Sequence, residues 1–238
     1  MSLYNGKNSI QNFHELVTSL APVPPSRVEG SNIVSEVVTF NGVRVLLYQP
    51  IKRKSDRPVA GLMYFHGGGF MLGSPEMFDD VTRAIAENLD IVVASVDYRL
   101  STEAPFPAAH EDCWTALRYF LAHAADYGVD PARVGVAGDS AGGNLAAGLA
   151  QRASSAESDP ALPRLKLQVL IYPQLQMLDF HTPSFQRHRA EFGEWGGIIP
   201  SRMSGTFRSF ILLGRHDPAL SAAMFANNHT SGAFKAAR

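Results

Sequence analysis

The stretch Gly138-Asp139-Ser140-Ala141-Gly142-Gly143 lies between a short apolar run at residues 132–137 and an alanine-rich segment at residues 144–150. The apolar run is typical of a buried strand, and the alanine-rich segment is typical of a helix. A G-x-S-x-G sequence between a strand and a helix predicts a sharp turn that exposes the serine, with glycines where the backbone passes close to itself. Ser140 is therefore the candidate nucleophile.

A second glycine-rich stretch, His66-Gly67-Gly68-Gly69-Phe70, follows another short apolar run at residues 61–65. Its N–H groups can stabilise the oxygen that becomes negative when a carbonyl is attacked, and the start of the helix after the serine can add a further donor. Because both stretches follow apolar runs, we expect both loops at the carboxyl ends of parallel strands, where open α/β sheets place their ligands. The predicted oxyanion hole consists of Gly67, Gly68, Gly69 and Ala141.

Composition predicts one ordinary domain. The chain has 238 residues, of which 45% are hydrophobic and 18% charged, so it can bury a sizeable core. The formal net charge of −1 argues against a nucleic-acid partner, because no basic stripe is available to contact phosphates.

No apolar run approaches the ~20 residues of a membrane span, so we expect a cytoplasmic chain. No Cys/His cluster has metal-ligand spacing, and the sole cysteine, Cys113, is expected to be buried, so we predict neither a metal nor a cofactor.

Alternating apolar runs and helical segments predict an α/β fold. Two β-branched runs at 34–40 and 43–48 are joined by Asn41-Gly42, which predicts an antiparallel hairpin. The other expected strands are 62–65, 91–96, 134–137 and 165–172, and the expected helices are 9–20, 77–88, 109–127 and one that begins at Ala141. We therefore expect a mostly parallel sheet with helices on both faces, in a single domain 1–238. Its parts would be an N-terminal arm at 1–30, the core sheet at 31–175 and a cap-like insertion at 176–238.

Five motifs occur in an order that resembles one known family. They are HGGG at 66–69, DYRL at 97–100, FPAA at 106–109, GDSAGGN at 138–144 and IYP at 171–173. The pattern resembles the hormone-sensitive-lipase branch of the α/β-hydrolases, especially the arylacetamide deacetylase-like esterases, from about Ile10 to the C-terminus. The resemblance implies an α/β-hydrolase fold with a partial cap, Ser140 as the nucleophile and small carboxylic-ester or arylamide substrates. It also implies association with the membrane of the endoplasmic reticulum only for a longer form of the chain.

A serine nucleophile needs a base, and the base needs a carboxylate that orients it. In this fold both are expected after the serine, the acid first. The downstream histidines are His181, His188, His216 and His229, and the downstream acids include Asp179, Glu191, Glu194 and Asp217. Asp217 and His229 are candidates for the acid and the base. Only twelve positions separate them, however, and a returning helix of about a dozen residues plus a strand of about five would not fit. We therefore expect the last two strands and the true acid and histidine to be missing, with Asp217 and His229, or another downstream histidine, as the open alternatives.

Several polar residues near the motifs are expected to support the site. His66 is expected to hydrogen-bond its own loop and not to act as a base. Asp97, Arg99 and Asp112 are expected to brace the two loops as a partly buried ion pair. Asp139 is expected to play a supporting role, because adjacent residues on a sharp turn point in different directions. Two histidines on the predicted surface helix, for which we expect no function, are His110 and His123.

Three hypotheses about function remain open. The favoured one is a carboxylesterase or deacetylase that works through an acyl-enzyme formed on Ser140. The second is a small-molecule binding protein on the same scaffold that lacks the base. The third is a non-functional or unstable fragment, because a chain without its last strands would expose the edge of its sheet, which predicts aggregation.

Overall fold

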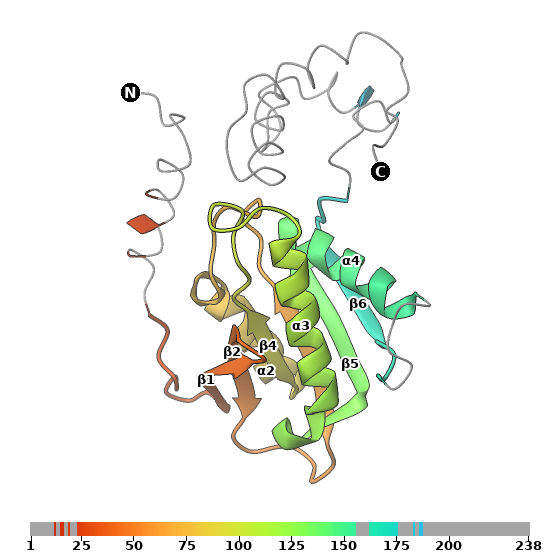
Figure 1. The fold of residues 1–238 in the computed structure, drawn as a ribbon. Coiled ribbons are helices and arrows are strands. Elements are labelled where there is room, and N and C mark those ends of the chain that lie inside the picture. The colour runs from red at the N-terminus through yellow and green to blue at the C-terminus, as the bar shows by residue number, and fades with distance from the viewer. Residues whose placement is uncertain are drawn as a thin grey trace, which may run out of the picture.

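The computed structural model describes residues 23–155 and 162–175, together with positions 12, 15, 16, 19, 183, 186 and 187. Its elements are β1 (Ile33–Phe40), β2 (Val43–Pro50), β3 (Val59–Phe65), η1 (Pro75–Phe78), α2 (Asp79–Leu89), β4 (Val92–Val96), α3 (Ala108–Ala122), η2 (Ala124–Tyr127), β5 (Val129–Asp139), α4 (Ala141–Ser154) and β6 (Leu167–Ile171). The strands form a six-stranded sheet in the order β1-β2-β4-β3-β5-β6 (Figure 1). β2 pairs antiparallel with β1 and β4, and the remaining pairs are parallel. The predicted α/β fold is confirmed.

The sheet begins with the predicted hairpin. Phe40 of β1 pairs with Val43 of β2 across the turn at Asn41 and Gly42. Both turn residues have positive φ, 49° and 90° respectively. This is the backbone that a two-residue type I′ turn requires, and asparagine and glycine adopt it at low cost.

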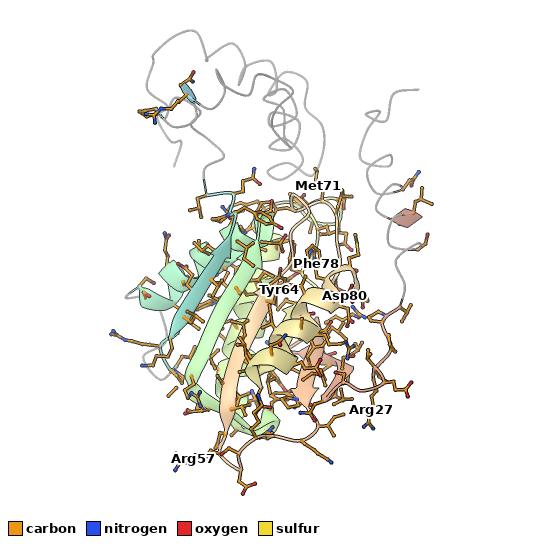
Figure 2. The ribbon with its side chains drawn as sticks, turned by 180° about the vertical axis from the view of Figure 1, so that it is seen from behind. Arg27, Arg57, Tyr64, Met71, Phe78 and Asp80 are labelled. Atoms are coloured by element: carbon orange, nitrogen blue, oxygen red, sulfur yellow. The ribbon has the colours of Figure 1, made fainter. Side chains whose placement is uncertain are left out.

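Helices cover both faces of the sheet. α3 and α4 lie on the face seen in Figure 1, and α2 crosses the opposite face, which Figure 2 shows from behind. Successive residues of β3 point to opposite faces of the sheet. Met63 packs in the core under α3 and α4, whereas Leu62 and Tyr64 pack with Ala86 of α2. The strands between these layers are therefore buried on both sides, which explains their nearly continuous apolar sequences.

Two element boundaries differ most from those that the sequence predicted. The expected helix at 109–127 ends at Ala122 and is followed by the short η2 helix, which ends where Gly128 takes a φ of 64°. β5 begins at Val129, before the predicted residue 134, because Val59 pairs with Val129 ahead of a register shift in the β3–β5 ladder. The expected helix at 9–20 falls largely outside the described residues, as does the cap-like insertion at 176–238.

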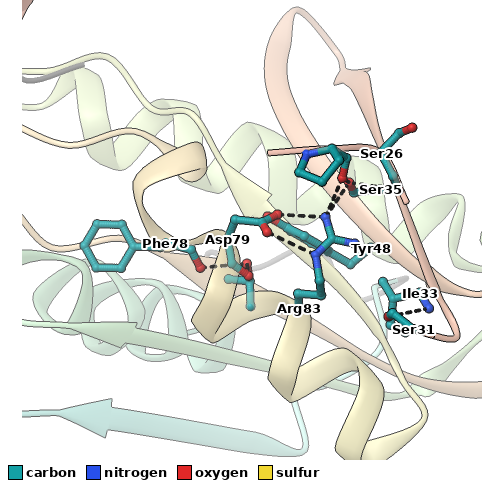
Figure 3. A network of polar contacts seen from close by, with 10 residues as sticks. Ser26, Ser31, Ile33, Ser35, Tyr48, Phe78, Asp79 and Arg83 are labelled. Atoms are coloured by element: carbon teal, nitrogen blue, oxygen red, sulfur yellow. Dashed lines mark hydrogen bonds and ion pairs between the residues drawn. The ribbon is translucent and has the colours of Figure 1, made fainter. Parts of the chain in front are cut away.

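A buried polar network links the segment around Pro25, near the start of described residues 23–155, to α2 (Figure 3). The Nε and Nη2 atoms of Arg83 each donate to the carboxylate of Asp79 at 3.0 Å, and the Tyr48 hydroxyl donates to the same carboxylate at 2.9 Å. Nη2 also donates to the Pro25 carbonyl at 2.9 Å and to the Ser35 hydroxyl at 3.0 Å. Burial raises the pKa of the Tyr48 hydroxyl, which therefore stays protonated and serves Asp79 as a donor. The segment around Pro25 is thereby attached to the same body that carries the glycine loop.

Candidate active site

The turn between β5 and α4 holds Ser140 in an unusual backbone conformation. Its φ is 51° and its ψ is −113°, a combination that costs a non-glycine residue on the order of 1–3 kcal/mol. Main-chain hydrogen bonds maintain it: the Ser140 N–H donates to the Ile171 carbonyl at 2.9 Å, and the Ser140 carbonyl accepts from the N–H groups of Asn144 at 3.2 Å and Gln174 at 3.0 Å. The sharp strand-to-helix turn expected from the G-x-S-x-G sequence is present, with the serine at the start of the helix.

Glycines allow this turn to pass against the end of β3. A Cβ atom on Gly138 would lie 2.7 Å from the Phe65 carbonyl oxygen, and one on Gly142 would lie 2.6 Å from the His66 carbonyl oxygen. A Cβ atom on Gly143 would lie 2.8 Å from the Cβ of Pro173. Each distance is shorter than a Cβ atom tolerates, so a side chain on Gly138 or Gly142 would push the serine turn away from β3, and one on Gly143 would push it away from Pro173.

The glycine loop and the serine turn leave the sheet side by side. Phe65 and Gly138 are paired across the parallel β3–β5 ladder, so residues 66–69 and residues 139–142 start from the same level of the sheet. A hydrogen bond joins the two segments, because the Gly67 N–H donates to Asp139 Oδ1 at 2.9 Å. Pairing in the sheet therefore brings together two motifs that lie some seventy positions apart in the sequence.

One of the four N–H groups that the sequence predicted as oxyanion donors already has a hydrogen-bond partner. The Gly67 N–H is already bound to Asp139, so Gly67 is not free to serve as a donor. Within residues 23–155 and 162–175, the N–H groups of Gly68 and Gly69 donate no hydrogen bond. Ala141 is the first residue of α4, where an N–H has no partner within the helix. Of the four predicted N–H groups, those of Gly68, Gly69 and Ala141 therefore have no partner among the described residues, whereas the Gly67 N–H orders the loop.

Asp139 lies beneath the two loops. Its side chain is 5% exposed, and its carboxylate accepts hydrogen bonds from the Tyr64 hydroxyl at 2.9 Å and the Tyr172 hydroxyl at 3.4 Å as well as from Gly67. Burial and the Asp139 charge raise the pKa of Tyr64, and the Asp139 charge raises the pKa of Tyr172, so both hydroxyls remain donors. This geometry suits a residue that holds β3, β5 and the segment after β6 together at the site.

His66 is completely buried under its own loop. Its Nδ1 atom donates to the Gly67 carbonyl at 2.7 Å, and its carbonyl accepts from the Tyr98 hydroxyl at 2.7 Å. The imidazole stacks on the rings of Tyr98 and Phe78, with centroid distances of 4.4 Å and 5.7 Å. Burial raises the pKa of Tyr98, which keeps its hydroxyl protonated as a donor. His66 therefore has the contacts expected of a residue that orders the loop.

The three residues expected to form an ion pair, Asp97, Arg99 and Asp112, take part in two ion pairs. Arg99 forms a two-pronged pair with Asp112, with N–O distances of 2.8 Å and 2.7 Å, and its N–H also donates to that carboxylate at 3.0 Å. Asp97 pairs with Arg44 of β2 at 2.9 Å, so ion pairs join Arg99 to Asp112 and Asp97 to Arg44. The physical reason is strand pairing: the Asp97 N–H donates to the Arg44 carbonyl, which brings the two side chains together.

Sequence reasoning missed two kinds of residue near the site. The tyrosines that bind Asp139 and His66 gave no signal beyond their positions at strand ends. His110 was expected on a surface helix, but it is half-buried, with its ring near those of Phe70 and Phe106. His123 is exposed. The candidate triad residues lie outside the described residues, namely Asp179, His181, His188, Glu191, Glu194, His216, Asp217 and His229.

The described part of the chain holds neither a metal-binding cluster nor a membrane-spanning helix. No group of three or more His, Cys, Asp or Glu side chains in it is arranged to hold a metal ion. None of its helices combines the length and the apolar character that crossing a membrane would require.

Comparisons with known proteins agree with this geometry. Residues 62–236 match a family described as having the alpha/beta hydrolase fold. The chain is 43% identical over 232 residues to the arylacetamide deacetylase of Oryctolagus cuniculus, in a match that covers 95% of this chain and 55% of that protein. It is 41% identical over 197 residues to neutral cholesterol ester hydrolase 1 of Rattus norvegicus, which covers 81% of this chain and 46% of that protein.

A solved structure of an esterase has a similar fold. The hyperthermophilic esterase of the archaeon Pyrobaculum calidifontis superimposes with a TM-score of 0.66 at 31% identity, over 95% of this chain and 67% of that one. The chain spans about half the length of the deacetylase and the cholesterol ester hydrolase that it matches. The serine turn and the glycine loop agree with these matches, which show that the chain belongs to the alpha/beta hydrolase family, in the hormone-sensitive-lipase branch that includes the arylacetamide deacetylases.

Proposed function

We propose that this chain carries the nucleophile and the oxyanion hole of a serine hydrolase that cleaves carboxylic esters or arylamides through an acyl-enzyme. The observation that carries the proposal is the position of Ser140, held at a φ of 51° at the first turn of α4 beside the glycine loop. The similarity to proteins named arylacetamide deacetylase and neutral cholesterol ester hydrolase supports this substrate class.

The geometry suggests how each part would act. Ser140 Oγ would attack the carbonyl carbon while a general base removes its proton, and the carbonyl oxygen would become negative. The N–H groups of Gly68, Gly69 and Ala141 would donate to that oxygen, and the positive end of the α4 dipole would stabilise it further. The carbonyl would then re-form as the alcohol or amine leaves, and water would release the acid from the serine.

The proposed oxyanion donors are ordered before any substrate arrives. Asp139 binds the Gly67 N–H, and the Gly68 carbonyl accepts from the N–H groups of Met71 at 3.1 Å and Leu72 at 3.0 Å, which closes the glycine loop on itself. A loop ordered in this way need not reorganise during the reaction, and such preorganisation makes hydrogen-bond donors effective in catalysis. We infer that Gly67 contributes to the site through this ordering.

The partners and location follow from the same proposal. The substrates would be small molecules, and the net charge of −1 argues against a nucleic-acid partner. We infer a cytoplasmic location, with association with the endoplasmic reticulum as the alternative that the family resemblance offers.

The test is a comparison of wild type with Ser140→Ala in the hydrolysis of p-nitrophenyl acetate. Loss of the nucleophile should remove all enzyme-dependent hydrolysis, a fall of roughly 10³-fold or more in kcat/KM for a complete site. Diethyl p-nitrophenyl phosphate should add a single diethyl phosphate mass to the wild type and none to Ser140→Ala. The control is Ser154→Ala, on the exposed last turn of the same helix, which should leave both results unchanged.

The remaining outcomes separate the alternatives. His229→Ala should have no effect if the base is missing from this chain, and it should abolish hydrolysis if His229 is the base. Hydrolysis that survives in Ser140→Ala would contradict the proposed nucleophile. A wild type that binds the ester but neither hydrolyses it nor takes up the phosphate would favour the small-molecule binding protein.

A further inference from the structure

His110, the third residue of α3, packs against the end of the glycine loop. Its imidazole stacks on the Phe70 ring with a centroid distance of 6.2 Å and an interplanar angle of 19°, and it meets the Phe106 ring edge-on at 5.3 Å. Phe70 directly follows Gly69, and its carbonyl accepts from both the N–H and the hydroxyl of Ser101, at 2.7 Å and 2.8 Å. The ring of His110 therefore rests on a residue that is fixed at the end of the loop.

The other edge of the same imidazole faces α4. A Cβ atom on Gly148 would lie 3.7 Å from His110 Cδ2 and 3.9 Å from His110 Nε2, so the helix backbone passes close to the ring. The side chain of Asn144, one turn after Ser140, lies near enough to His110 to influence its pKa. Asn144 itself donates from Nδ2 to the Gln174 carbonyl at 2.7 Å and from its N–H to the Ser140 carbonyl at 3.2 Å. The His110 ring therefore lies against the helix that follows Ser140.

The two charged groups near His110 have opposing effects on its pKa. Glu111 on α3 and Arg152 on α4 act on it in opposite directions, and they form an ion pair with each other at 2.8 Å. Burial is the largest influence and lowers the pKa of His110 below 6.5, although the nearby Asn144 side chain and the charge of Glu111 act to raise it. The imidazole is therefore neutral at pH 7 and gains its charge only under acidic conditions.

We propose that His110 is a positioning residue whose ring, held between Phe70 and the backbone of α4 at Gly148, couples the glycine loop to the nucleophile helix. A protonated ring would be a cation in a largely apolar place, so it would move toward water and release both contacts. Acid would then loosen the loop and the helix together. The catalytic consequence rests on the proposed function, but the coupling itself does not.

The coupling can be measured without any turnover. We would follow the backbone amide resonances of Gly69, Phe70 and Asn144 by nuclear magnetic resonance between pH 5 and pH 8. The three should shift with one midpoint, below 6.5, that equals the midpoint of the His110 ring protons. His110→Phe keeps an aromatic ring on Phe70 but cannot titrate, so the common midpoint should disappear. The control is His123→Phe, an exposed histidine just after the same helix, in which the common midpoint should persist.

Two results of that experiment would overturn the proposal. One is a set of midpoints that differ between Gly69 and Asn144, and the other is a common midpoint that survives in His110→Phe. Either result would show that the loop and the helix do not respond to His110.

Turnover of p-nitrophenyl acetate provides the second readout. His110→Ala removes the ring, so we expect kcat to fall roughly 10-fold with KM unchanged, because the donors are displaced while substrate contacts remain. His110→Phe should retain most of the activity at pH 7.5. A coupled titration together with hydrolysis that persists in Ser140→Ala would reject the proposed function and leave the coupling intact. An unchanged kcat in His110→Ala would overturn the positioning role.

Discussion

The centre and the edge of the described sheet differ in what surrounds them. Val134 and Val136 of β5 have no exposed surface, because α2 lies on one side of the central strands and α3 and α4 lie on the other. On β6, Leu167 is 55% exposed and Val169 is 37% exposed, although both are as apolar as the residues of β5. Apolar sequence thus makes a strand in both places, but only the centre is enclosed.

This difference matters for the site because both strands end there. β5 leads into Ser140, and β6 leads into Tyr172, whose side chain is 73% exposed and whose hydroxyl reaches back to Asp139. The serine turn packs closely against β3 at Gly138 and Gly142, and it meets the segment after β6 through main-chain hydrogen bonds of Ser140 and the close contact of Gly143 with Pro173. Because the side chains of β6 are partly exposed, we expect them to contribute less to stability than the enclosed centre of the sheet and the serine turn. Three substitutions test this, in order of decreasing effect.

Gly142→Ala should have the largest effect. The new Cβ atom would lie 2.6 Å from the His66 carbonyl oxygen, and neither backbone can move without separating β3 from β5. We expect a loss of at least about 4 kcal/mol in the free energy of unfolding, measured by urea denaturation. The matched control is Gly148→Ala on the same helix, where the nearest atom is at 3.7 Å, and it should gain up to about 1 kcal/mol. Equal stabilities for the two variants would contradict the close packing described at the serine turn.

Asp139→Ala should have an intermediate effect. It leaves the buried Tyr64 hydroxyl and the Gly67 N–H without their acceptor, which should cost about 2–4 kcal/mol in the free energy of unfolding. Asp139→Asn retains an acceptor oxygen and should cost less, although it loses the charge. Thermal unfolding of the two variants, followed by circular dichroism, provides the measurement. An alanine variant as stable as the asparagine variant would show that these hydrogen bonds contribute little.

Leu167→Lys should have the smallest effect on stability. The side chain is more than half exposed at the edge strand, so we expect a change below about 1 kcal/mol and a larger fraction of monomer in gel filtration. Met63→Ala, at a fully buried position of β3, is the contrasting variant and should lose about 2–5 kcal/mol. If Leu167→Lys were as damaging as Met63→Ala, the edge would be as well enclosed as the centre, and the comparison would fail.

Local patterns were enough to predict most of the elements and the serine turn. Asn41 and Gly42 determine the hairpin because their own backbone preferences match the turn. The glycines at 138, 142 and 143 predicted a close approach, and the structure shows that the partner is the end of β3 together with Pro173. The element boundaries that were misplaced, such as the start of β5, depend on pairing with Val59, which no local pattern encodes.

By itself the sequence determined the alternation of strands and helices, the hairpin and the strained serine, because each depends on residues that are neighbours along the chain. Only the tertiary structure decided which partners the polar groups take: Asp97 binds Arg44, the Gly67 N–H binds Asp139, and His110 lies between Phe70 and α4. Hydrogen bonds and ion pairs form over a few ångströms, so they depend on strand register and on which helix face meets which loop. Those relations are set by the packing of the whole chain, and a one-dimensional pattern does not specify them.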